Sequence, residues 1–379
     1  MALTQPPLSL YVHFPWCVRK CPYCDFNSHE TREIPEQSYL KALLQDFDQD
    51  SDLWRGRQLQ SIFFGGGTPS LFRADTFTEL LAQLAKRIAF AADIEITLEA
   101  NPGTFEQEKF KGYFQAGINR LSLGVQSFHD HHLTALGRIH GADEARFAVE
   151  RAQQAGFSNL NIDLMHGLPQ QTIEQALADL ATALQLNPTH LSWYQLTIEP
   201  NTVFYNQPPQ LPADESLWQI QQQGQALMAA QGFNQYEVSA YSVPQKRSRH
   251  NLNYWQFGDY LALGAGAHGK ITQVETGQII RYQKTRLPKD YLAPEKAFTA
   301  SHHSVPRQNL AFEFFMNGLR LNQGASRLGF KQYTGLSESD IATPIQQALN
   351  KELLHITSSH WVPTEKGHLF LNDLLDLFL

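Results

Sequence analysis

Short stretches of apolar and β-branched residues recur along the first half of the chain, and each is bounded by turn residues. Such stretches are typical of buried strands. Between them, apolar residues repeat at helical spacing, as in Tyr39–Phe47, Leu80–Ile88 and Ala176–Leu184. The six predicted strands begin at Leu8, Gln60, Asp93, Asn119, Asn159 and His190.

The alternation of strands and helices predicts an α/β fold built on a parallel sheet, with right-handed crossovers. Six units are too few for a complete barrel, so we expect a partial (β/α)6 barrel of the TIM type. In such a fold the site lies at the carboxyl ends of the strands. Four polar residues lie late in, or just after, predicted strands and indicate one shared site: Glu99, Gln126, Asp163 and Gln195.

The strand–helix pattern ends near residue 207, in a proline-rich link that leads to a predicted helix over Glu215–Gln231. We therefore predict a barrel over residues 1–235 and an irregular segment over 236–300. Helices followed by short strands predict a winged-helix-like C-terminal domain over 301–379. This last domain has no concentrated basic patch, which favours a packing or partner role over DNA binding.

Charge and hydropathy exclude several classes of protein. The 379 residues carry 30 Lys and Arg against 37 Asp and Glu, a net charge of -7 that argues against nucleic acid as a partner. No run of about 18 apolar residues predicts a membrane span. The N-terminus lacks the basic opening and apolar core of a secretory signal. We therefore expect a cytoplasmic protein, in which thiols stay reduced.

The chain has only three cysteines, and they lie within eight residues as C-x3-C-x2-C: Cys17, Cys21 and Cys24. Three reduced thiols so close together indicate a metal site rather than a disulfide framework. Thiolates bind iron–sulfur clusters, and a four-iron cluster would keep one iron open for another ligand. The alternative is a structural zinc site completed by His13 or His29.

This cysteine spacing directly after a first strand resembles that of the radical S-adenosylmethionine (SAM) enzymes. Tyr23 matches the aromatic residue of the family's cysteine loop, and Gly65–Pro69 is similar to its glycine element at the end of the second strand. The resemblance implies a [4Fe–4S] cluster on the three cysteines. It also implies that the SAM methionine group binds the open iron beside the glycine backbone.

The motifs YVHFPWCVRKCPYCDFNSH, FFGGGTPS, LEANPGT, RLSLGVQSF, LGRIHG and NIDLMHGLPQQT follow the order found in the oxygen-independent coproporphyrinogen dehydrogenase group. The resemblance continues through RHNLNYW and GAGAHG and covers nearly the whole chain. It implies SAM contacts, with the carboxylates taking the amino group or ribose and an arginine taking the methionine carboxylate. The implied contacts are Tyr11, Tyr23, Gly66, Gly67, Thr68, Glu99, Gln126, Arg138, Asp163 and Gln195.

Two kinds of protein occur within this group. The dehydrogenases carry a fourth cysteine two residues after the third, where this chain has Phe26. The HemW haem chaperones have phenylalanine there and carry an H-N-x-x-Y-W motif. This chain has both features and resembles the HemW group. That resemblance implies a haem site at the motif. Arg247 and Arg249 lie just before the motif, where they could meet haem propionates, and His268 is a second imidazole candidate. The motif residues are His250, Asn251, Tyr254 and Trp255.

Three functions remain open from the sequence. The first is a haem chaperone that binds haem and delivers it to respiratory proteins. In this case the cluster and SAM serve binding, dimerisation or transfer, and no residue is predicted to be catalytic. The second is a dehydrogenase that oxidatively decarboxylates coproporphyrinogen III, and the third is a zinc-stabilised interaction protein. The expected partners are haem, haem-receiving respiratory proteins and an electron donor, together with a second copy of the chain and a peripheral membrane contact.

Overall fold

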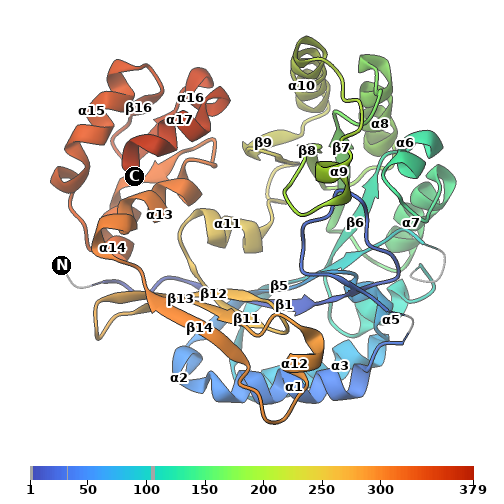
Figure 1. Ribbon diagram of the computed structural model, residues 1–379, viewed down its shortest axis with the longest axis horizontal. Coiled ribbons are helices and arrows are strands. Elements are labelled where there is room, and N and C mark those ends of the chain that lie inside the picture. Colours follow the sequence, from blue (N-terminus) through green and yellow to red (C-terminus); the bar gives the residue numbers. More distant parts are fainter. Residues whose placement is uncertain (1–2, 32, 104–106) are drawn as a thin grey trace.

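The computed structural model describes residues 3–31, 33–103 and 107–379. Six parallel strands follow one another in chain order in the middle of one large, curved sheet (Figure 1). The predicted strands and their parallel arrangement are therefore confirmed, as is the α/β fold class. The six strands are β1 (Leu8–Phe14), β4 (Gln58–Gly66), β5 (Ala89–Ala100), β6 (Arg120–Gln126), β7 (Leu160–His166) and β8 (His190–Gln195).

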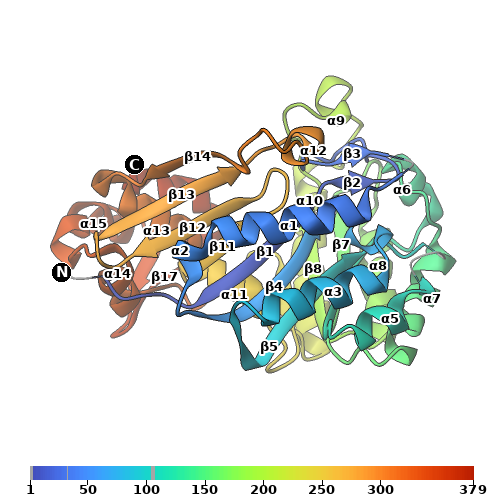
Figure 2. The ribbon, with the colours of Figure 1, turned by 90° about the horizontal axis from the view of Figure 1, so that it is seen from below.

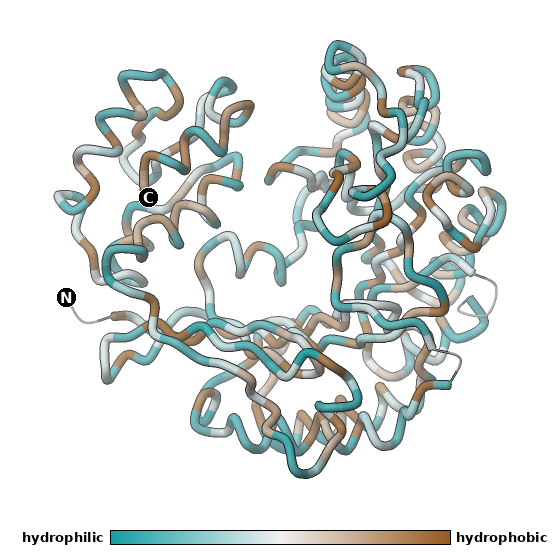
Figure 3. The backbone as a smooth tube through the Cα atoms, in the orientation of Figure 1, coloured by the Kyte–Doolittle hydropathy of each residue, from teal (hydrophilic) through white to brown (hydrophobic). Residues whose placement is uncertain are grey.

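Amphipathic helices cover the outer face of this sheet, as Figure 2 shows for α1 and α3. Their apolar stripes face inward, so the trace of these helices alternates between brown and teal in Figure 3. In α1, for example, Tyr39, Leu43 and Phe47 are buried. The helices of this part are α1 (Glu36–Gln49), α3 (Ala74–Ala85), α5 (Phe110–Gln115), α7 (Ala142–Gln154), α8 (Ile173–Gln185) and α10 (Asp214–Ala230).

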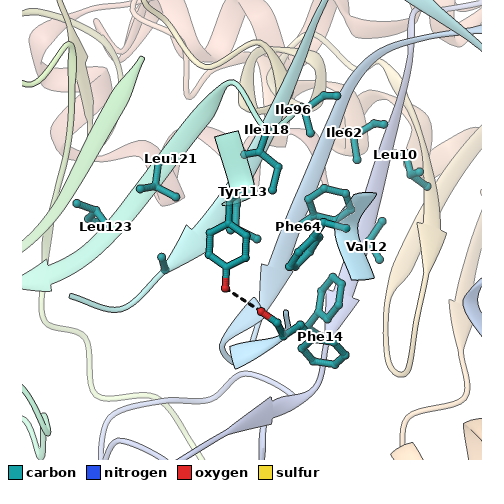
Figure 4. Close-up of a cluster of buried hydrophobic side chains, with 14 of the residues drawn as sticks. Leu10, Val12, Phe14, Ile62, Phe64, Ile96, Tyr113, Ile118, Leu121 and Leu123 are labelled. Carbon is teal, nitrogen blue, oxygen red and sulfur yellow. Dashed lines mark hydrogen bonds between the residues drawn. The ribbon is translucent and has the colours of Figure 1, made fainter. Parts of the chain in front are cut away.

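The core between sheet and helices is continuous and mostly aliphatic and aromatic (Figure 4). Val12, Phe14 and Phe64 are fully buried, and burial of each such side chain contributes about 1.5–3 kcal/mol. The hydroxyl of Tyr113 donates hydrogen bonds to the carbonyls of Ser70 and Phe72 at 2.6 and 2.8 Å. These bonds fix the loop after β4 to the core, close to the carboxyl ends of the strands.

Further strands extend both edges of the sheet. β11 (Asp259–Leu263) pairs with β1 in parallel. Antiparallel strands continue the sheet beyond β11 and, at the other edge, beyond β8: β12 (His268–Gln273), β13 (Gln278–Lys284) and β14 (Thr299–Ser304), then β10 (Ala240–Ser242) and β9 (Asn234–Glu237).

The prediction that residues 236–300 are irregular was therefore wrong. These residues supply sheet strands and the helix α11 (Arg249–Trp255), which lies on the inner face of the sheet against β1 and β4 (Figure 1). The strands are short and pair across long separations in sequence, so their local pattern is too brief to reveal them. Shorter elements complete the barrel part: β2 (Trp16–Cys17), β3 (His29–Glu30), α2 (Ser51–Trp54), α6 (Asp130–Ala135), α9 (Val203–Asn206) and α12 (Pro288–Tyr291).

The C-terminal region has its own core, in which Phe315, Phe330 and Trp361 pack together. It combines helices with a small antiparallel sheet, as the sequence predicted. None of the described helices is long and apolar enough to cross a membrane. Its elements are α13 (Leu310–Gly318), α14 (Arg327–Thr334), α15 (Ala342–Asn350), α16 (Glu365–Leu369) and α17 (Leu371–Leu375), with β15 (Ala325–Ser326), β16 (Leu354–Ile356) and β17 (His360–Pro363).

Candidate functional site

The three thiols are free and face one cavity of about 310 Å³. Cys17 ends the short strand β2, and Cys21 and Cys24 lie in a turn closed by a 3.1 Å hydrogen bond from the Cys24 N–H to the Cys21 carbonyl. Burial raises the pKa of Cys17 to about 11, so metal binding must displace a proton there. Among the described residues, no group of three His, Cys, Asp or Glu side chains is spaced to hold a single metal ion.

The strand ends that the sequence singled out meet at this cavity. Eight of the ten predicted SAM contacts line it, including residues at the ends of β4, β5 and β6 and one in the middle of β7. Tyr11 instead lines a neighbouring cavity, and Gln195 lies outside both. The eight are Tyr23, Gly66, Gly67, Thr68, Glu99, Gln126, Arg138 and Asp163.

Two glycines at the end of β4 cannot be replaced without displacing their neighbours. Gly66 has a φ of +119°, and a Cβ there would lie 2.6 Å from the ring of His13. A Cβ on Gly67 would lie 2.4 Å from the Trp16 carbonyl oxygen. The missing side chains let the backbone come close both to the cysteine loop and to whatever occupies the cavity.

Two buried carboxyl groups face the cavity from β5 and β7, the strands on either side of β6. Burial, and then the nearby Asp163, raise the pKa of Glu99 to about 8. Burial also raises the pKa of Asp163, which accepts hydrogen bonds from Asn161 at 2.8 Å and Ser122 at 3.0 Å. A ligand with a positive charge or hydroxyl donors would offset this burial, so the pair suits an amino group, a sulfonium or a ribose.

The guanidinium of Arg138 lies between the carboxyl ends of the strands and the cysteine loop. Its Nη2 donates to Asn101 Oδ1 at 2.7 Å and to the Gly124 carbonyl at 2.6 Å, while Nη1 lies 3.7 Å from Cys21 Sγ. Its Nε is buried without a hydrogen-bond partner among the described residues. Arg138 thus keeps an unpaired donor and a buried positive charge beside the cavity, which suits an anionic group.

Sequence reasoning missed Tyr194, which lines the cavity and donates a 2.8 Å hydrogen bond to Gln126 Oε1. Successive side chains of a strand point to opposite faces. Since Tyr194 faces the cavity, Gln195 next to it points away. Gln126 itself has a φ of +71°, an uncommon conformation for a side-chain-bearing residue. Asn101, which directly follows β5 and also lines the cavity, was likewise not predicted. Both Asn101 and the strained Gln126 lie at the carboxyl edge of the sheet.

A second cavity of about 570 Å³ adjoins the first and shares Phe26, Gly66 and Glu99 with it. Its volume lies within the range of about 300–1,000 Å³ that ligand pockets occupy. Tyr254, Trp255 and Tyr260 form an aromatic part of its wall, and the rings of Tyr254 and Tyr260 meet edge to face at 4.4 Å. The remaining lining comes from several parts of the chain: Tyr11, His13, Asp25, Asn27, Gly266, Ala267, His268, Gln283, Arg286 and Asn317.

His250 lies beneath this cavity and does not line it. Only 1% of the residue is exposed, and its two ring nitrogens are hydrogen-bonded to Ser61 Oγ at 3.0 Å and to the Tyr254 hydroxyl at 2.9 Å. Asn251 is also outside the lining, and its N–H donates to the cap residue Ser248. Of the H-N-x-x-Y-W motif, the structure therefore brings only Tyr254 and Trp255 to the cavity.

Comparison with known proteins identifies the family. A model of the radical SAM superfamily matches residues 11–182, and one of the HemN C-terminal domain matches residues 305–370. Along 379 aligned residues, the chain is 53% identical to the heme chaperone HemW of Haemophilus influenzae, covering 99% of this chain and 98% of that protein. The chain belongs to the HemW family.

A second member of the HemW family, from Escherichia coli, is 51% identical and covers 99% of this chain and 98% of its own. Among solved structures, the HemN coproporphyrinogen III oxidase of Escherichia coli matches with a TM-score of 0.83. That match covers 99% of this chain and 90% of HemN, at 24% identity, and shows a common fold. Membership of the radical SAM superfamily implies a [4Fe–4S] cluster and SAM. The cavity fits them, since it combines three free thiols, glycine backbone, two carboxyl groups and a buried arginine.

Proposed function

We propose that the protein is a haem chaperone, which binds haem and delivers it to haem-requiring respiratory proteins. The observation that carries this proposal is the second cavity, because it offers an aromatic wall large enough for a flat ligand directly beside the thiol-lined cavity. The name heme chaperone HemW, borne by relatives of about half identical sequence, supports haem as the ligand.

In this proposal Cys17, Cys21 and Cys24 hold the [4Fe–4S] cluster, and SAM lies over it in the first cavity. Arg138 takes the methionine carboxylate, the backbone of Gly66 and Gly67 lies along the methionine end, and Glu99 or Asp163 takes the amino group or the ribose hydroxyls. When bound, the cluster supplies one electron for cleavage of the SAM sulfonium. The remaining proposed contacts are Tyr23, Thr68 and Gln126.

Haem is the cargo, and its place is the second cavity. Tyr254 and Trp255 supply flat apolar surface for the macrocycle. His250 holds the Tyr254 hydroxyl from below, and whether it also reaches the haem iron is a prediction that the variants below test. Asn251 lies next to it in the first turn of α11, where its backbone N–H donates to the capping hydroxyl of Ser248.

The proposed setting of this activity is the cytoplasm. An electron donor reduces the cluster, and respiratory proteins receive the haem. A dimer of the chain and a peripheral contact with the membrane that holds the recipients complete the proposal. Nucleic acid is no partner, since the net charge is -7.

The test is a ferric haem titration of the anaerobically reconstituted protein, followed by visible absorption. We expect binding of one haem per chain, and no saturable binding would overturn the proposal. The HemN-like fold makes coproporphyrinogen III dehydrogenase the second candidate. If the cluster-loaded protein with SAM and a reductant converts coproporphyrinogen III to protoporphyrinogen, the dehydrogenase is the correct function. Metal analysis that finds zinc, and no iron or sulfide, would favour the zinc-stabilised interaction protein.

A further inference from the structure

Two imidazoles line the second cavity, and their surroundings differ. His13 is buried, and its ring nitrogens are occupied by the Tyr11 hydroxyl and the Asn27 carbonyl, each at 2.9 Å. His268, the first residue of β12, is exposed at the cavity wall. Its ring makes no hydrogen bond with any part of the chain that the structure describes. Of the two, His268 is the one with free ring nitrogens.

We propose that His268 binds the iron of the haem held in the second cavity, and that Arg286 meets one of the haem propionates. This inference rests on the haem-binding function proposed above. The bond forms from the lone pair of a neutral imidazole nitrogen to ferric iron, with no change in oxidation state. Imidazole is a common axial ligand of haem iron, and the guanidinium forms charge-assisted hydrogen bonds with carboxylates.

Three of the other polar groups on the cavity wall already have partners within the protein. The Tyr254 hydroxyl is bonded to His250, and that of Tyr260 accepts from Arg281. Glu99 accepts from the Gly66 N–H. A ligand that used any of these groups would first have to break a bond within the protein, whereas coordination by His268 breaks none. Partial burial and the nearby Arg281 also lower the pKa of His268, which keeps the imidazole neutral near pH 7.

The backbone holds His268 in place from behind. In the β12–β13 pair, His268 lies opposite Gln283, which also lines the cavity, and Gly269 lies opposite Tyr282. A Cβ on Gly269 would come within 2.2 Å of the Tyr282 ring, so the strand packs more closely than a side chain would allow. An imidazole whose backbone is supported in this way loses little conformational freedom when it binds iron.

The same wall is tied to the cysteine loop through Asn27. Its Nδ2 donates to the carbonyls of Ala265 and Arg286 at 3.0 and 2.9 Å. A Cβ on Gly266 would lie 2.3 Å from that amide, so the segment before His268 packs directly on Asn27. The positions of His268 and Arg286 therefore depend on the loop that carries the three thiols.

The experiment is a ferric haem titration of the cluster-loaded protein and three variants: His268→Ala, His250→Ala and His355→Ala. Visible absorption gives the affinity, and electron paramagnetic resonance gives the spin state of the iron. His355 is an exposed histidine on β16, which does not line the cavity, and serves as the matched control. Added imidazole then tests whether a vacated ligand position can be refilled.

Removal of an outer partner of a metal ligand already costs about 10–100-fold in affinity, so loss of the ligand itself should weaken binding at least about tenfold. We expect this loss, and the loss of the imidazole-bound spectrum, in His268→Ala, with recovery on addition of imidazole. His355→Ala should match the wild type. If His268→Ala keeps the wild-type spectrum and affinity, or imidazole restores nothing, this inference is wrong while the haem-binding function stands. Loss confined to His250→Ala, with recovery on addition of imidazole, would assign the ligand to His250, and no haem bound by the wild type would refute both.

Discussion

The backbone N–H of Gly66 donates a 3.1 Å hydrogen bond to Oε2 of Glu99, and this pair is part of the wall of both cavities. A ligand that changes the charge or position of Glu99 in the first cavity therefore changes the wall of the second. This shared wall gives SAM a direct physical means of influencing a haem-sized ligand, through contact rather than over a distance.

The first prediction concerns the charge state of Glu99. Its pKa of about 8 in the folded protein lies above the ordinary value of 4.5, so the folded state holds a proton that the unfolded state releases. The stability gained from this proton is complete below about pH 4.5 and is lost as the pH rises to about 8. Glu99→Gln removes the titration. The free energy of unfolding of the wild type should thus fall relative to that of Glu99→Gln by up to about 1.4 kcal/mol per pH unit in this window.

Denaturant unfolding at pH 5.5 and 8, with the cluster assembled and SAM absent, measures this difference. Asp93→Asn provides a control, because Asp93 is exposed and its pKa is lowered by Arg249. A difference between wild type and Glu99→Gln that is equal at both pH values would contradict the prediction.

The second prediction separates an iron–sulfur cluster from zinc. Replacement of Cys17, Cys21 or Cys24 by Ala should each abolish the cluster, because no other cysteine exists in the chain. His29→Ala should leave the cluster intact, because His29 is a candidate ligand only in the zinc alternative. Iron, sulfide and zinc analysis with visible absorption distinguishes the two. Loss of bound metal in His29→Ala, with zinc in the wild type, would support zinc.

The sequence predicted the strands and the thiol-lined cavity because both depend on local signals. Periodicity identifies a buried strand, and parallel strands bring their carboxyl ends to one edge, so Glu99, Gln126 and Asp163 were expected to meet. Because side chains alternate along a strand, however, a shift of one residue decides whether Tyr194 or Gln195 faces the cavity. The sequence indicates that polar residues gather at a strand end, but the register that turns Tyr194 inward is set by pairing with β7 and β10.

The second cavity could not be predicted from local patterns. Its wall combines Phe26 of the cysteine loop with Tyr254, His268 and Asn317, which belong to three different parts of the chain. Motif spacing likewise made His250 the first candidate for haem. The pattern could not show that Ser61 and Tyr254 occupy both of its ring nitrogens, since Ser61 lies on a strand 189 residues away in sequence.

The third prediction concerns Arg138. Its Nη2 already donates to Asn101 and Gly124, which leaves Nη1 and the unpaired Nε for a ligand, whereas a lysine has no second or third nitrogen. Arg138→Lys should weaken SAM binding by about tenfold or more, as expected for the loss of hydrogen bonds to a charged group. Isothermal titration of the cluster-loaded protein gives the affinity. Arg151→Lys, on the outside of α7, is the control, and unchanged SAM affinity in Arg138→Lys would remove this residue from the site.

The fourth prediction concerns the stability of the sheet extension that carries His268. Lys284, on β13, is buried with its Nζ 2.5 Å from Asp46 Oδ1 and 2.7 Å from Asp50 Oδ2, so it joins the extension to α1. Lys284→Met leaves two carboxyl groups without their cation. We expect it to lower the free energy of unfolding by about 3–5 kcal/mol, as for other buried pairs that lose one partner.

Urea unfolding gives the value for Lys284→Met, and Lys296→Met is the matched control. Lys296 pairs with Asp290 at 2.7 Å, but about half of its side chain is exposed, so its removal should cost about 1 kcal/mol or less. Lys284→Met combined with Asp46→Leu should recover part of the loss, because the combination removes the unpaired charge of Asp46. If the double variant is no more stable than Lys284→Met, the loss comes from packing around the lysine stem instead of from the unpaired carboxylate. In that case the ion pairs of Lys284 do not hold the sheet extension that carries His268 against α1.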